Sequence, residues 1–219
     1  MVFLYKIGKF KVMKKQNENA LIIFTKSPKL GHCKTRIAKE IGDEKALAVY
    51  QHLLTHTQHI TACVTNCDKF VYYSTTQNPV EDIWNDDTYH KNIQTQTSNL
   101  GKRMSDAFKT VFEKGYQNVI IIGSDLYDFD SESIEKAFIS LQQHDFVIGP
   151  CEDGGYYLLG MKTIQENIFE NKQWSSESVF AETLNDILEE KKTVSIQKLR
   201  NDIDYYEDII GIPELEVLL

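Results

Sequence analysis

Residues 118–125 read Asn-Val-Ile-Ile-Ile-Gly-Ser-Asp, and this stretch decides the fold. Asn118–Ile122 is a continuous run rich in β-branched residues, which is typical of a strand that is buried on both faces of a sheet. The run ends at Gly123, and Ser124 and Asp125 follow at once. The pattern therefore predicts a central strand with a carboxylate just beyond its carboxyl end.

Strand-like runs and helical stretches alternate on both sides of this segment. The further strands are expected at Ala20–Thr25, Phe70–Ser74, Asp145–Gly149, Tyr156–Gly160 and Thr193–Gln197. Helices are expected at Asp43–Thr61, at Asn99–Lys114, along the stripe Ile134, Ala137, Phe138 and Leu141, and along the stripe Val179, Phe180, Thr183, Leu184 and Ile187. The polar segment Trp84–Tyr89 is expected to be a loop. Alternation of this kind predicts an α/β fold with a mostly parallel sheet and helices on both faces.

Composition restricts the function classes. The chain has 219 residues and a formal net charge of -8, which argues against broad binding of nucleic acid. It has no apolar run of about 18 residues, so no membrane-spanning helix is expected. Lys6, Lys9 and Lys11 interrupt the apolar start, which does not resemble a signal peptide. We expect residues 1–13 to be a leader or disordered segment and residues 14–219 to be one domain.

The four cysteines carry no metal signature. Cys33, Cys63, Cys67 and Cys151 contain no Cys-x-x-Cys pair. Reduced, unpaired thiols are the expected state, and they indicate a cytoplasmic protein.

A basic loop follows the first expected strand. Lys26–Lys34 reads KSPKLGHCK, and Arg36 comes two residues later. Positive side chains beside a flexible backbone suit a di- or triphosphate. The GK[ST] ending of a Walker loop is missing, and an ordinary basic surface loop remains the alternative.

Acidic residues follow the central strand and the last expected strand. Asp125 ends the central strand, where ligands of open α/β sheets bind. The segment Asn201–Asp204 follows the last strand and can return a second carboxylate to the same edge. By contrast, Asp130 is expected to cap the next helix, and Asp43 is expected to cap the helix that runs to about Thr61.

The segment Pro150–Tyr157 reads PCEDGGYY. Its two glycines allow a close backbone approach to a ligand, but Asp-Gly also favours a hairpin turn, and both descriptions can hold together.

Three features invite functional interpretations that we do not favour. The histidines of the second helix, His52, His56 and His59, lack a carboxylate partner and are expected on a solvated face. Ser124 has no Gly-x-Ser-x-Gly setting, so it is not expected to be a nucleophile. Trp174 is expected to be a packing anchor before a helix.

The order of the motifs adds a resemblance. TKSPKLGHCKTRI, LGKRM, GSD, GPCEDGGYYLLG, QWSSESVFAET and NDIDYYEDI follow one another between about residue 20 and residue 210. This order resembles the uncharacterised selenodomain-associated transferases, which are GT-A-like glycosyltransferases of the nucleotide-diphospho-sugar transferase superfamily. It is more distantly similar to molybdenum-cofactor guanylyltransferases, phospholactate guanylyltransferases and CMP-Kdo synthetases. GPCEDGGYYLLG is the most specific segment.

The resemblance implies a single GT-A, Rossmann-like three-layer sandwich that binds a nucleotide with Mg²⁺ or Mn²⁺. By position, Lys26, Lys34 and Arg36 match the nucleotide-binding phosphate loop. Arg103 matches the basic residue after the leucine–glycine pair, where it would bind the nucleotide and assist catalysis.

The remaining site residues also come from the resemblance. Asp125 and Asp204 match the metal-binding carboxylates. Asp153, Gly154, Gly155 and Tyr156 match a substrate-binding loop that faces the sugar or the acceptor. Apart from the resemblance, Asp153 is the expected catalytic base if the reaction inverts the anomeric centre.

The chain departs from the family pattern at two turns. Leu126 and Tyr127 stand where cysteine and proline are usual, and Tyr205 and Tyr206 stand where threonine and proline are usual. Asp125 and Asp204 are retained, so these changes bear on the substrate more than on the metal.

Three functions are compatible with these residues. The first is a metal-dependent glycosyltransferase with a nucleotide-sugar donor and a small-molecule acceptor. The second is a nucleotidyltransferase that joins a nucleoside triphosphate to a phosphorylated small molecule. The third is a catalytically degenerate binding protein of the same fold.

Overall fold

The computed structural model describes residues 17–74, 83–84 and 88–219. The expected leader at residues 1–13 lies outside this part of the chain. The strands are β1 (Asn19–Thr25), β2 (Asp68–Tyr73), β3 (Tyr89–Ile93), β4 (Asn118–Ile122), β5 (Phe146–Pro150), β6 (Tyr156–Met161) and β7 (Val194–Ile196). The α-helices are α1 (Thr35–Ile41), α2 (Asp43–Cys63), α3 (Leu100–Glu113), α4 (Ser131–Gln143), α5 (Val179–Glu189) and α6 (Pro213–Glu216). Two 3₁₀ helices are η1 (Glu166–Phe169) and η2 (Tyr206–Ile209).

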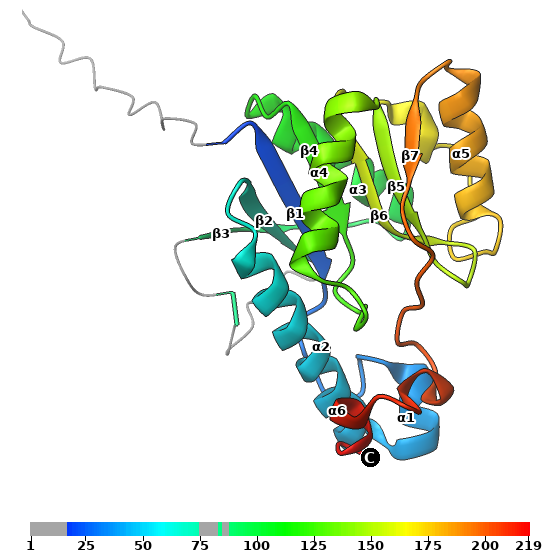
Figure 1. Cartoon of the computed structure of the whole chain (residues 1–219). Coiled ribbons are helices and arrows are strands. Elements are labelled where there is room, and N and C mark those ends of the chain that lie inside the picture. Colours follow the sequence, from blue (N-terminus) through cyan, green and yellow to red (C-terminus); the bar gives the residue numbers. More distant parts are fainter. Residues whose placement is uncertain (1–16, 75–82, 85–87) are drawn as a thin grey trace, which may run out of the picture.

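The strands described form one mostly parallel sheet in the order β3-β2-β1-β4-β6-β5-β7 (Figure 1). Only β6 among them runs against its neighbours, and it pairs antiparallel with both β4 and β5. The reversal arises because residues 151–155 join β5 directly to β6 in a hairpin. The predicted α/β fold is confirmed.

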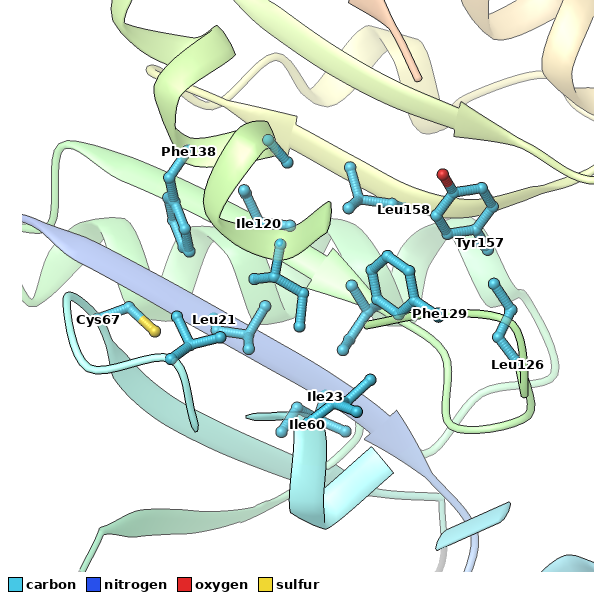
Figure 2. Close-up of a cluster of buried hydrophobic side chains, with 14 of the residues drawn as sticks. Leu21, Ile23, Ile60, Cys67, Ile120, Leu126, Phe129, Phe138, Tyr157 and Leu158 are labelled. Atoms are coloured by element: carbon cyan, nitrogen blue, oxygen red, sulfur yellow. The ribbon is translucent and has the colours of Figure 1, made fainter. Parts of the chain in front are cut away.

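The two central strands are buried on both faces, as the β-branched run predicts. Ala20 and Ile22 of β1 face one side of the sheet, and Leu21 and Ile23 face the other. This alternation follows from the two-residue repeat of a strand. Helix α4 covers the face that carries Leu21, and Figure 2 shows Phe138 of that helix in one cluster with Ile120 and Leu21. Helices α3 and α5 cover the opposite face, which completes the predicted three-layer sandwich.

A third cluster lies beyond the carboxyl end of β1. There α1, the first half of α2, η2 and α6 bury Ile37, Val49, Leu53, Ile203 and Ile209. Figure 1 shows the chain after β7 running down to this cluster, where α6 lies beside α1 and α2. The cluster therefore fixes the last acidic segment next to the basic loop.

Three local expectations differ from the structure. Helix α1 was not expected, because its seven residues are too few to show an apolar repeat. Strand β3 was not expected either, because it is an edge strand with an exposed, polar sequence that begins inside the expected loop. Asp43 begins α2 but does not cap it, since Gly42 holds the cap position. No helix among the described residues is long and apolar enough to cross a membrane.

Candidate functional site

A cavity of about 590 Å³ opens at the carboxyl ends of β1 and β4. The basic loop, Asp125 and the last acidic segment all contribute to its lining, although they lie far apart in sequence. The expected site residues in the lining are Lys26, Lys34, Arg36, Arg103, Asp125, Asp153, Gly155, Tyr156 and Asp204. Gly154 is the expected site residue that the lining does not include.

Lys34 lies at the centre of the charged part of this cavity. Its Nζ donates to Asp125 Oδ2 at 3.1 Å and to Asp204 Oδ1 at 2.8 Å. The lysine side chain is only 5% exposed, whereas the two carboxylates are 37% and 33% exposed. Burial alone would lower the pKa of Lys34, but the two carboxylates outweigh it, and the pKa lies above its ordinary value. Lys34 is therefore a buried, fully charged cation between two acids.

The backbone at Lys34 explains how its side chain turns inward. The residue precedes α1 and has a left-handed conformation, with φ at 47° and ψ at 47°. For a residue other than glycine this conformation costs about 1 kcal/mol, and such strain is concentrated at functional positions. The Lys34 backbone carbonyl still accepts the first helical hydrogen bond, from the N–H of Ala38 at 2.9 Å.

A third carboxylate, that of Asp202, completes the acidic group. One oxygen each from Asp125, Asp202 and Asp204 lies within 4.8 Å of the others, a spacing at which one metal ion could contact all three. Burial and then the charges of Asp125, Asp204 and Asp153 raise the pKa of Asp202 to about 7. For Asp125, burial also acts to raise the pKa, but Lys34 outweighs it, and the pKa lies below its ordinary value.

Backbone contacts hold the late acidic segment at this edge. The N–H of Ile203 donates to Asp125 O at 3.0 Å, and Leu126 forms a β-bridge with Asp202. Cys151 forms a second bridge with Arg200. These contacts place Asp202 and Asp204 beside Asp125 without an eighth full strand in the described chain.

Two further basic residues line the cavity in different surroundings. Arg36 is half exposed and donates to Asp204 Oδ2 at 3.0 Å. Arg103 donates from Nη1 to Gln94 Oε1 at 2.9 Å, and its buried Nε lacks a hydrogen-bond partner among the described residues. Burial lowers the pKa of Arg103, but a guanidinium remains charged under ordinary conditions. Both side chains can offer donors to an anion in the cavity.

Residues 151–155 form the hairpin loop that the Asp-Gly pair favours. The carboxylate of Asp153 accepts a hydrogen bond from the Gly155 N–H at 2.8 Å. Gly154 has a φ of +83°, and an added Cβ would lie 2.1 Å from the carbonyl oxygen of Glu177. The close approach that Gly154 permits is therefore to the segment before α5. Its role in binding a substrate stays a prediction.

Two aromatic residues have roles that the sequence pattern did not reveal. The hydroxyl of Tyr50 contacts both the backbone N–H and the carbonyl of Lys26, at 2.9 and 3.0 Å, and so fixes the start of the basic loop. Trp174 packs edge-on to Tyr156, as expected of an anchor, but it also lines the cavity. A tyrosine in the apolar stripe of α2 looks like core, so no sequence signal marked the first role.

The histidines and the serine that we set aside in the sequence have neighbours that fit structural roles. His52 and His56 lie against the ring of Tyr127, and none of the three histidines belongs to a potential metal group among the described residues. Ser124 is buried and donates to the hydroxyl of Thr25. The four cysteines form no disulfide. Asp130 caps α4 by accepting from the Ser133 N–H, as predicted.

Several solved structures are similar to this chain over most of its length. A protein described as a candidate nucleotide-diphospho-sugar transferase from Desulfovibrio desulfuricans G20 is 27% identical, with a TM-score of 0.83 over 92% of this chain and 94% of its own. CMP:2-keto-3-deoxy-manno-octonic acid synthetase, complexed with CTP, is 8% identical, with a TM-score of 0.56 over 91% and 98% of the two chains. Rv0371C from Mycobacterium tuberculosis H37Rv, in complex with manganese, is also 8% identical, with a TM-score of 0.55 over 88% and 95%. The last two likenesses show the fold alone.

Comparison with curated proteins gives no match. A family model does match residues 58–176, which is more than half of the chain, and its description is "Uncharacterized protein conserved in bacteria (DUF2064)". The matched segment runs from α2 through the central strand and the β5–β6 hairpin to Ser176. The chain belongs to this DUF2064 family.

Proposed function

We propose that this protein is a metal-dependent glycosyltransferase that takes its sugar from a nucleotide-sugar donor. One observation carries the proposal: Asp125, Asp202 and Asp204 converge within 4.8 Å in a cavity that is also lined by the basic loop. The similarity to the Desulfovibrio protein supports the transferase class. Carboxylates beside basic side chains suit a nucleoside diphosphate that binds together with a divalent metal. The carboxylates would hold the metal, and the basic side chains would bind the phosphates.

The acidic group fits a hard divalent cation. It offers three carboxylate oxygens, the ligand type that Mg²⁺ and Mn²⁺ prefer. The charges also favour a cation, because Lys34 and Arg36 balance only two of the four carboxylates formed by this group and Asp153. Asp125, Asp202 and Asp204 would hold the metal, which would supply Lewis-acid stabilisation of the diphosphate.

The basic residues of the chain have separate parts in the proposed reaction. As the bond between the anomeric carbon and the diphosphate oxygen breaks, the electron pair and the negative charge move to the diphosphate. Lys34 and Arg36 would stabilise this charge, because they are fixed donors at the acidic group. Lys26 and Arg103, at other parts of the cavity lining, would bind the rest of the nucleotide.

Asp153 is the proposed general base. The acceptor hydroxyl attacks the anomeric carbon, and its proton passes to the Asp153 carboxylate as the new C–O bond forms. Gly155 and Tyr156, which follow Asp153 in the cavity lining, are the proposed contacts to the sugar. The hydrogen bond from the Gly155 N–H holds the Asp153 carboxylate in place.

The test compares two kinds of donor with Mn²⁺ present. Release of a nucleoside diphosphate from a nucleotide sugar would support glycosyl transfer. Release of pyrophosphate from a nucleoside triphosphate would instead support nucleotidyl transfer, and a synthetase that shares the fold does bind the nucleoside triphosphate CTP. A thermal-shift screen of nucleotides and nucleotide sugars would identify the donor first, since a ligand that binds the folded state raises its stability. The absence of any nucleotide binding would overturn the proposal.

A further inference from the structure

A second cavity, of about 700 Å³, adjoins the first. Asp202 and Asp204 of the acidic group line both cavities and so form a common wall between the two spaces, whereas Asp125 lines the first. The other lining residues that the two cavities share are Arg36, Asp153, Ser175 and Ser176. Other residues of the described chain line the second cavity without lining the first: Glu177, Ser178, Asn201, Tyr205 and Asp208. The chain therefore has room for two different ligands on either side of the same carboxylates.

The two cavities differ in charge. Besides Arg36, the first is lined by Lys26, Lys34 and Arg103. Among the residues that the structure describes, Arg36 is the one basic residue that lines the second, and its guanidinium is already paired with Asp204. Facing it are the carboxylates of Asp153, Glu177, Asp202, Asp204 and Asp208.

The carboxylate of Asp208 lies in the second cavity and is held by hydrogen bonds. It accepts hydrogen bonds from uncharged donors, namely the Asn201 amide and the backbone N–H groups of Asp204 and Tyr205, at 2.6 to 2.9 Å. None of these donors carries a positive charge that would balance the carboxylate. A phosphorylated ligand would meet repulsion in the second cavity and attraction in the first.

The polar groups that line the second cavity suit a ligand with hydroxyl groups. Ser175, Ser176 and Ser178 supply hydroxyls, and carboxylate oxygens accept hydrogen bonds from ligand hydroxyls. Tyr205 adds an aromatic side chain that is 53% exposed, with the guanidinium of Arg36 at 5.0 Å from the ring centroid. An exposed aromatic ring offers an apolar surface to the C–H face of a sugar ring.

We propose that this second cavity binds the acceptor, and that the acceptor is a neutral, polyhydroxylated molecule without a phosphate group. The inference rests on the proposed function for its donor. Asp153 lines both cavities, so it is placed to take the proton from an acceptor hydroxyl while the nucleoside diphosphate leaves on the other side. A neutral acceptor distinguishes glycosyl transfer from nucleotidyl transfer to a phosphorylated molecule.

Saturation-transfer NMR on the full chain tests the acceptor class. The protein is loaded with Mg²⁺ and the nucleoside diphosphate that stabilises it most. Two panels are then added: methyl glycosides of the common hexoses, N-acetylhexosamines and free polyols, and the matching sugar 1-phosphates. Signals from neutral members, with none from the phosphates, are the expected result. Signals confined to the phosphates, or no signal from any neutral member, would overturn the inference.

Variants locate the bound probe. Tyr205→Ala and Glu177→Lys change exposed residues of the second cavity, so both are expected to fold. Each should weaken the neutral probe about tenfold, as expected for the loss of an important interface contact, and leave nucleotide affinity unchanged. Glu113→Lys, at the exposed end of α3, is the matched charge reversal outside both cavities and should change neither.

The same data separate this inference from the proposed function. If the wild-type protein binds no nucleotide, the proposed donor site itself is wrong. If the nucleotide binds but neither cavity variant affects the neutral probe, only the acceptor assignment is wrong.

Discussion

The ammonium nitrogen of Lys34 lies 2.8 Å from the carboxylate of Asp204, across 170 positions of sequence. It also lies 3.1 Å from Asp125, so a cation of the protein itself links the two acids. Lysine and a divalent metal would bind the same oxygens, and the two cations should therefore compete. Binding of a nucleotide would resolve the competition, since its phosphates offer the ammonium another anionic partner.

The first prediction is that Lys34→Met destabilises the protein and tightens its binding of Mn²⁺ without nucleotide. Removing one partner of a buried ion pair leaves uncompensated charge. We expect a loss of about 2 kcal/mol, less than for a fully buried pair because a third of each carboxylate is exposed. Urea unfolding with and without Mn²⁺ measures both effects, and Mn²⁺ should restore part of the stability.

Arg36→Met is the control for Lys34, because Arg36 pairs with the same Asp204 from a half-exposed position. It should cost less than about 1 kcal/mol. Equal stability losses in the two variants, or no tightening of Mn²⁺ binding in Lys34→Met, would contradict competition between lysine and metal.

The second prediction concerns nucleotide affinity. Lys34→Ala and Arg36→Ala should each weaken nucleotide binding by roughly 1–3 kcal/mol, the range for hydrogen bonds to charged groups. Calorimetry with Mn²⁺ present measures the change, and Lys114→Ala, at the far end of α3, is the control. Unchanged affinity in both site variants would remove these residues from the nucleotide site.

The third prediction tests whether the acidic residues bind a metal or only occupy the ends of strands and turns. Asp125→Asn and Asp202→Asn should fold and should each lose at least about tenfold in Mn²⁺ affinity, since one charged ligand is removed. Electron paramagnetic resonance of free Mn²⁺ measures this directly. Glu113→Gln removes an exposed charge elsewhere and should leave the affinity unchanged; a similar affinity in all three variants would exclude a metal site here.

The central part of the fold could be predicted because local sequence determines it. The β-branched run before Gly123 favours a doubly buried strand, and the carboxyl end of that strand sets the position of Asp125. Helix α1 and strand β3 could not be predicted. Their local signal is weak, and their stability comes from packing against α2 and from pairing with β2.

The acidic group could be predicted only in part. Asp204 came from the family resemblance, and Asp202 was overlooked as a ligand although residues two apart in an extended segment point the same way. The second cavity had no sequence signal. It forms where the segment before α5 meets the last acidic segment, and that contact depends on tertiary structure.

The fourth prediction is that the cap of α4 makes stability depend on pH. The hydrogen bond from Ser133 lowers the pKa of Asp130. A carboxyl whose pKa is lowered on folding contributes stability above its unfolded pKa and loses it as the pH falls through the folded value. Asp130→Ala should cost about 1 kcal/mol at pH 7. Asp130→Asn keeps the cap without the charge, so it should lose less stability than wild type between about pH 5 and pH 3.

Chemical denaturation of the three proteins at both pH values measures this effect. If Asp130→Asn follows the wild-type pH profile, other carboxylates account for the acid sensitivity, and the pH dependence predicted for this cap is wrong.

The last prediction concerns the glycine of the β5–β6 hairpin. Gly154 combines a φ of +83° with backbone atoms of Glu177 at 2.1 to 2.5 Å from where a Cβ would lie. Gly154→Ala should therefore cost about 2–4 kcal/mol, the sum of left-handed strain and overpacking. The adjoining segment also carries Ser175 and Ser176, so the shift should in addition disturb both cavities.

Gly211→Ala separates strain from overlap. Gly211 has nearly the same φ, +87°, but has nothing within 4 Å of an added Cβ. It should cost only about 1–2 kcal/mol, from the left-handed conformation alone. Urea unfolding measures both variants, and the difference between them is the part caused by contact with Glu177. Equal costs would show that the hairpin tolerates a side chain at Gly154, and the contact with the segment before α5 would then not be what requires a glycine there.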